Sequence, residues 1–120
     1  MEVLLGIDFG TTNTVISYFS NNKSIILMDG IFKTIPSKIA KINDKYYCGN
    51  YIPIHTNNII HSFKLLDDNY DLLHIFFKHL YDLIIKLLKL ERPILKAVIT
   101  VPSNFNDKQR EIIKFKTKIV

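Results

Sequence analysis

Eight residues near the N-terminus, Gly6-Ile7-Asp8-Phe9-Gly10-Thr11-Thr12-Asn13, combine one carboxylate with a turn of small residues. An apolar run over residues 3–7 leads into Asp8, and a second apolar run over residues 14–19 follows the turn. A carboxylate in a buried strand costs free energy unless a cation or hydrogen-bond donors meet it. The backbone N–H groups and hydroxyls of the turn suit phosphate oxygens. The pattern favours a β-hairpin whose turn binds phosphates while Asp8 faces a metal ion. The alternative is an ordinary tight turn with a capping aspartate.

Short strands, separated by turn residues, are expected to position this hairpin within a sheet. The first three form a β-meander, and an extended stretch and one more strand follow, over residues 3–9, 14–20, 24–28, 35–42 and 46–48. Residues 49–58 are irregular in pattern, and Pro53 prevents a regular helix across them.

The period of the sequence changes after residue 70. Polar residues recur every three or four positions from Asp71 to Leu90, which predicts one long, largely buried helix with a narrow polar stripe. His74 falls on that stripe and His79 borders the apolar face; Asp68 or Asn69 can cap the start.

A continuous apolar run after the helix, Ala97–Val101, is typical of an interior parallel strand. The order strand, helix, strand predicts a right-handed crossover back onto the first sheet. Asn106 and Gln109 then form a capping box that starts a further helix.

The composition describes one ordinary globular domain. The 120 residues are 48% hydrophobic and 22% charged, and the net charge of +5 comes from lysines spread along the chain. Without an aromatic and basic stripe, this charge does not indicate a nucleic-acid partner. Cys48 has no partner for a disulfide, which favours a reducing compartment, and the polar residues within Leu72–Leu90 exclude a simple membrane span. We expect a soluble, cytoplasmic protein.

Four segments resemble the seventy-kilodalton heat-shock chaperones, which belong to the actin-like ATPase superfamily. Residues 6–13 look like the first phosphate-binding hairpin that these chaperones share with actins and sugar kinases. Val98–Arg110 resembles the chaperones' strand, Val-Pro bend and Phe-Asn-Asp helix start, which sugar kinases lack. Ser62–Leu66 resembles the segment that holds their catalytic lysine, and Thr34–Ala40 is a weaker match to their Thr-Thr-Pro-Ser stretch.

The resemblance implies an α/β fold: a partial actin-like (ribonuclease H-like) ATPase lobe with a β-meander, a right-handed β-α-β crossover and a mixed sheet. It implies ATP and Mg²⁺ as ligands, with Asp8 holding the magnesium ion through water. Lys64 would stabilise charge that develops on the γ-phosphate during hydrolysis. From the residues alone, Lys64 is a solvated lysine before a turn. The phosphate-binding residues implied are Gly10, Thr11, Thr12 and Asn13.

The resemblance covers nearly all of residues 1–120 but only part of the family's nucleotide-binding domain. The second phosphate loop, the adenosine-binding segment, the second lobe and the substrate-binding domain have no counterpart. We therefore expect a truncated first lobe that binds ATP as a fragment of a chaperone ATPase, a family that acts in protein folding and the stress response.

Hydrolysis by this chain alone is not expected, so whether it is an enzyme stays open. The strand Ala97–Val101 should also lack one neighbour, leaving a charge-free edge. The alternatives are an interaction module that docks onto a complementary lobe, a co-chaperone or a full-length chaperone, a non-functional gene remnant, and a small sugar kinase.

Overall fold

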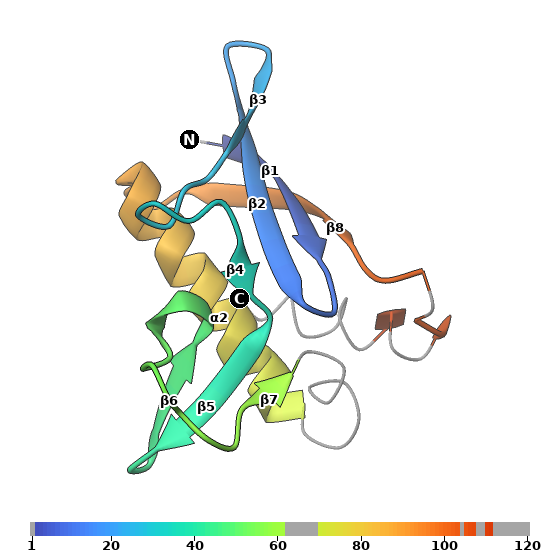
Figure 1. Cartoon of the computed structure of the whole chain (residues 1–120). Helices are drawn as coiled ribbons and strands as arrows, with labels where there is room; N and C mark the ends of the chain where they lie inside the picture. Colours follow the sequence, from blue (N-terminus) through green and yellow to red (C-terminus); the bar gives the residue numbers. More distant parts are fainter. Residues whose placement is uncertain (1, 62–69, 104, 108–109, 112–120) are drawn as a thin grey trace.

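Two β-sheets pack against one long helix, α2 (Tyr70–Leu88), in the computed structural model (Figure 1). The structure describes residues 2–61, 70–103, 105–107 and 110–111. Asp68 and Asn69, the expected caps of the helix, and Gln109, the partner in the expected capping box, lie outside the described residues.

The larger sheet carries the strands that the sequence placed in a meander. β1 (Glu2–Phe9), β2 (Asn13–Ser20) and β3 (Lys23–Ile26) are antiparallel neighbours, and the two-residue β4 (Ile35–Pro36) also pairs with β2. After α2, β8 (Ile94–Thr100) returns and pairs in parallel with β1. The predicted α/β class and mixed sheet are therefore confirmed.

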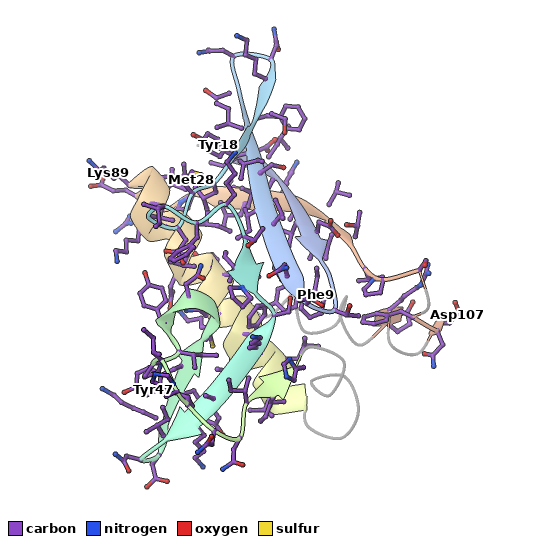
Figure 2. All side chains as sticks on the ribbon, in the orientation of Figure 1. Phe9, Tyr18, Met28, Tyr47, Lys89 and Asp107 are labelled. Carbon is purple, nitrogen blue, oxygen red and sulfur yellow. The ribbon has the colours of Figure 1, made fainter. Side chains whose placement is uncertain are left out.

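One face of this sheet is covered and the other is open. Along β1, Leu5, Ile7 and Phe9 are buried against α2, whereas Leu4 and Asp8 are exposed on the opposite face. This alternation follows from the two-residue period of a strand. The Phe9 ring lies 5.8 Å and 5.2 Å from the rings of two α2 phenylalanines, and Figure 2 shows the side chains that fill the space between sheet and helix.

Helix α2 is buried along most of its surface. The exposed residues Lys78, Asp82 and Lys86 confirm the predicted polar stripe, and the Lys78 Nζ lies 2.6 Å from a carboxylate oxygen of Asp82. His74 was predicted on the stripe, which is wrong: it is half-buried, and its Nδ1 is shielded from solvent with no hydrogen-bond partner. Within the described residues, no helix combines the length and apolarity that crossing a membrane requires.

The smaller sheet contains β5 (Lys38–Ile42), β6 (Lys45–Cys48) and β7 (Ile60–His61), in the order β6-β5-β7. A short 3-10 helix, η1 (Gly49–Tyr51), follows β6 and packs beside β4. Helix α2 also packs against β5 and β6, so one helix holds both sheets together.

β8 differs from its sequence-based prediction in two ways. It begins at Ile94, three residues earlier than expected, so it includes Lys96, whose Nζ lies 3.3 Å from a Glu2 carboxylate oxygen. The prediction of a charge-free strand is therefore wrong. β8 also lies at the edge of the sheet, because among the described strands only β1 pairs with it. Among the described strands, the prediction of an interior strand therefore fails.

Candidate functional site

The site begins with the turn that joins β1 and β2. The Phe9–Thr14 pair ends the strand ladder, and the Gly10 N–H donates a hydrogen bond to the Asn13 carbonyl at 3.0 Å. A Cβ at Gly10 would lie 2.6 Å from the Asn13 oxygen, closer than real Cβ contacts come. Glycine is therefore required for the turn to close this tightly.

The turn is fixed from behind by the junction of β4 and β5. The Ser37 N–H donates to the Thr12 carbonyl at 2.9 Å, and the Ser37 and Thr14 hydroxyls lie 2.8 Å apart, both fully buried. Because a buried polar pair has few other partners, these bonds hold the turn in one place. The side chains of Thr11, Thr12 and Asn13 are exposed on the solvent side.

Asp8 lies beside this turn, near the C-terminal end of β1, on the open face of the sheet. It was predicted to be buried, and this is wrong, since α2 covers only the face that carries Leu5, Ile7 and Phe9. The Thr100 hydroxyl donates a hydrogen bond to the Asp8 carboxylate at 2.9 Å, and the two residues are partners in the β1–β8 register. The carboxylate is oriented by one bond and still open to solvent.

The donor set fits a magnesium–phosphate group. Mg²⁺ prefers oxygen ligands and keeps several waters, so one exposed carboxylate that reaches the ion through water is a suitable partner. The neighbouring turn offers two threonine hydroxyls and an asparagine amide on the same edge. Asp8 and residues 10–13 are thus brought together as expected, while Lys64 lies outside the described residues.

Two contributors to the site were missed by sequence reasoning. Thr100 was treated only as part of an apolar strand. Parallel neighbouring strands end at the same edge of a sheet, so a hydroxyl at the C-terminal end of β8 was a signal that it could reach Asp8 near the C-terminal end of β1. Ser37 was noted for its resemblance to a family segment but given no role. Its contact with Thr14 joins residues 23 positions apart, and no local pattern signals such a pairing.

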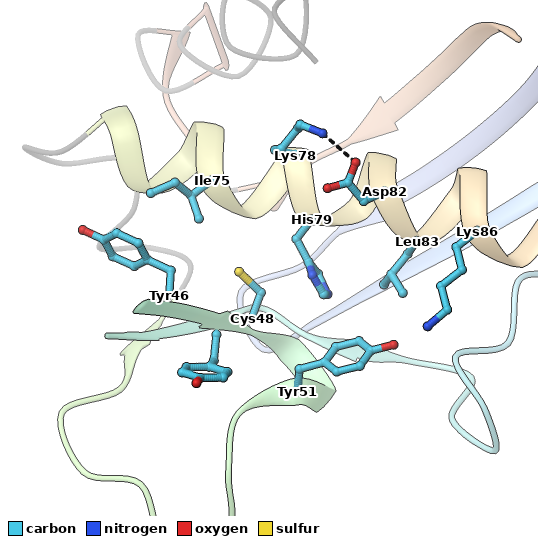
Figure 3. A pocket seen from close by; sticks show the side chains of 10 residues that line it. Tyr46, Cys48, Tyr51, Ile75, Lys78, His79, Asp82, Leu83 and Lys86 are labelled. Carbon is cyan, nitrogen blue, oxygen red and sulfur yellow. Dashed lines mark hydrogen bonds and ion pairs between the residues drawn. The ribbon is translucent and has the colours of Figure 1, made fainter. Parts of the chain in front are cut away.

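Away from this site, a hollow lies between β6, η1 and α2 (Figure 3). Cys48 is buried there, and burial raises the pKa of its thiol to about 12. Since the thiolate is the reactive form, Cys48 behaves as a small buried apolar residue and not as a nucleophile.

His79 faces the Tyr51 ring edge-on at 5.3 Å in the same hollow, and burial lowers its pKa, which nearby Asp29 and Asp82 partly oppose. Its Nε2 is shielded from solvent and has no hydrogen-bond partner. The hollow therefore contains no ionised thiol, and the Nε2 of His79 is not accessible from it.

Comparison with known proteins gives a consistent set of relatives, although no protein-family model matches the chain. The chain is 34% identical over 135 residues to the chaperone protein DnaK of Mycoplasmopsis pulmonis, covering 98% of this chain and 22% of that protein. It is 34% identical to DnaK of Ureaplasma urealyticum, covering 94% of this chain and 21% of the relative. A chaperone protein HscA homolog of Rickettsia prowazekii is 31% identical, with 99% of this chain and 25% of the relative covered. The chain thus spans about a fifth to a quarter of the length of these curated relatives.

Proposed function

This chain belongs to the seventy-kilodalton heat-shock chaperone family, of which it matches one segment, and we propose that it binds the phosphates of Mg-ATP at the β1–β2 turn. The observation that carries the proposal is the pairing of a fixed turn with an open carboxylate. The hydrogen bonds of Ser37 to Thr12 and Thr14 fix the turn on its buried side. Asp8 lies next to the turn and accepts a hydrogen bond from the Thr100 hydroxyl.

In this proposal the residues of the turn and of β1 have separate roles. The exposed side chains and backbone N–H groups of residues 11–13 donate hydrogen bonds to phosphate oxygens. Asp8 would hold the magnesium ion through water, and the Thr100 hydroxyl orients the Asp8 carboxylate. Mg²⁺, when bound, would neutralise phosphate charge, and phosphoryl transfer depends on this neutralisation together with positioning of the phosphates. We assign Lys64, by resemblance, to the γ-phosphate.

We further propose that this chain does not hydrolyse ATP by itself. Preorganised charge in a water-excluded site is usually the largest contribution to such catalysis. The proposed site lies on an open sheet face, with Asp8 and residues 11–13 all exposed. Affinity also depends on enclosure of the ligand, so binding by one turn alone should be weak.

Titration calorimetry with ATP, in the presence and absence of Mg²⁺, tests this proposal. We expect binding that needs Mg²⁺ and that weakens about tenfold, or about 1.4 kcal/mol, in Asp8→Asn. Asp44→Asn is the matched control, because Asp44 is also exposed and its left-handed backbone, at a φ of 63°, accepts asparagine. Equal affinity in the two variants, or no binding at all, would contradict the phosphate assignment. Turnover by the purified chain would contradict the proposed lack of hydrolysis.

A second candidate function is docking onto a complementary chaperone lobe. The open face of the larger sheet favours it, because Leu4, Phe19 and Ile26 are 49%, 57% and 44% exposed there. Large exposed apolar patches commonly mark interaction surfaces. Mixing the chain with the remaining part of a related chaperone and measuring restored ATP hydrolysis separates the two candidates. Absence of both a complex and activity would remove this second one.

A further inference from the structure

Lys38 directly follows the residue that fixes the proposed phosphate turn. The Ser37 N–H donates to the Thr12 carbonyl at 2.9 Å, and the Ser37 side chain is fully buried. Successive side chains along a strand point to opposite faces, so Lys38 belongs on the open face. Pro36, the partner of Asn13 in the β2–β4 register, lines the same hollow as Lys38, as this alternation requires.

Lys38 and Asp8 lie on opposite sides of the turn. At this end of the larger sheet the strands follow each other in the order β8, β1, β2 and β4, and the turn joins the two central ones. Asp8 is on β1, with the Thr100 hydroxyl of β8 on its outer side. Lys38 comes where the chain passes from β4 to β5 beside the turn (Figure 1). The open face therefore carries a carboxylate, then the turn, then a cation.

The charge of Lys38 is only partly solvated. The residue is half-buried, and among the described residues it takes part in neither ion pair. The hollow that it lines has a volume of about 280 Å³, and none of the described residues around it is an aspartate or a glutamate. Withdrawing a charge from water costs free energy unless an opposite charge meets it. An anion bound beside the turn would supply that opposite charge.

We propose that Lys38 binds phosphate oxygens of the nucleotide from the β4 side of the turn, opposite Asp8. This inference rests on the proposed function and adds one binding residue to it. A lysine has three donors on a flexible stem and binds phosphate as a point charge. Asp8 faces the phosphates through the magnesium ion on one side, and Lys38 brings positive charge directly to the other side.

Titration calorimetry of Lys38→Gln and Lys41→Gln measures this contribution, with Mg-ATP and with magnesium tripolyphosphate as ligands. Lys41 is the matched control, because it lies on the same strand, is exposed, and has its Nζ over the Tyr46 ring at 5.5 Å. Both variants lower the net charge by one, so a general effect of charge is equal in the two. We expect Lys38→Gln to bind both ligands about fivefold more weakly than Lys41→Gln. Circular dichroism checks that both variants fold.

Chemical acetylation of the lysines, followed by mass spectrometry, gives a readout that a merely structural role would not change. Saturating Mg-ATP should slow the acetylation of Lys38 in the wild-type chain and leave that of Lys41 unchanged. Lys38→Arg keeps the positive charge and should retain most of the wild-type affinity in calorimetry.

The outcomes separate this inference from the proposed function. If the wild type binds Mg-ATP and Asp8→Asn weakens binding, but Lys38→Gln and Lys41→Gln bind alike, the proposed function stands and the role of Lys38 is wrong. A loss for Mg-ATP without a loss for tripolyphosphate would also overturn that role, because the contact would not be to phosphate. Absence of binding by the wild type would contradict both.

Discussion

The hydroxyls of Thr14 and Ser37 form a fully buried polar pair directly behind the proposed phosphate turn. Ser37→Ala leaves the Thr14 hydroxyl buried without this partner, so we expect a loss of about 1–3 kcal/mol in the free energy of unfolding. The double variant Thr14→Val with Ser37→Ala removes both hydroxyls and should recover part of that loss. Urea denaturation of the wild type, of Ser37→Ala, of Thr14→Val and of the double variant gives the coupling energy. Additive effects would show that the two hydroxyls do not act as a pair.

His79 makes stability depend on pH. Burial lowers its pKa in the folded chain from the usual 6.5, with Asp29 and Asp82 opposing the shift in part. Below pH 6.5 the unfolded chain binds a proton that the folded chain does not, so the free energy of unfolding falls as the pH falls and is unaffected well above this value. Thermal melts at a series of pH values below 6.5 should show that the stability of His79→Phe falls less with falling pH than that of the wild type. His55→Asn, at an exposed residue with a φ of 67°, should leave the fall unchanged.

The C-terminal end of α2 carries a local strain that a single substitution can relieve. The Leu90 N–H donates to the Ile85 carbonyl at 3.1 Å, as in a Schellman motif, and Lys89 adopts a left-handed φ of 52°. Glycine adopts this conformation without a Cβ clash, so Lys89→Gly should raise the free energy of unfolding by about 0.5 kcal/mol. Lys86→Gly, within the helix, should lower it by about 0.5–1 kcal/mol. Chemical denaturation measures the free energy of unfolding of both variants. A change of the same sign in both would contradict the proposed strain at Lys89.

At the scale of elements, alternation and helical period were sufficient to predict most of the fold. The strands of the meander, the long helix and the parallel return strand follow from local patterns that agree with their tertiary surroundings. The errors came where burial depends on a neighbouring element. Asp8 alternates with Leu5 and Ile7 along β1, so its side chain lies on the opposite face and its exposure could have been predicted from the sequence. The half-buried state of His74 could not.

The candidate site was predictable only in its local part. The turn and Asp8 are contiguous, so their spacing alone brought them together. Ser37 and Thr100 reach the site through strand pairings at long range, which single-residue patterns do not encode.

The whole molecule is organised around one helix that serves two sheets. Phe76 is fully buried in the core between α2 and the larger sheet, and α2 also packs against β5 and β6. Phe76→Ala should lower the free energy of unfolding by about 3–5 kcal/mol and destabilise both sheets together. Far-UV circular dichroism and tyrosine fluorescence should give coincident transitions. Phe19→Ala, at a 57% exposed residue, should have little effect. Separate transitions would mean that the smaller sheet folds independently.

The hydrogen bond from Thr100 to Asp8 joins residues 92 positions apart in the chain. On the ribosome, the β1–β2 hairpin emerges first, but its carboxylate has no hydroxyl to orient it until the strand that carries Thr100 has been synthesised and has docked alongside. A nascent chain that has only the hairpin lacks the Thr100 hydroxyl, so we expect the proposed nucleotide affinity to arise only late in biosynthesis.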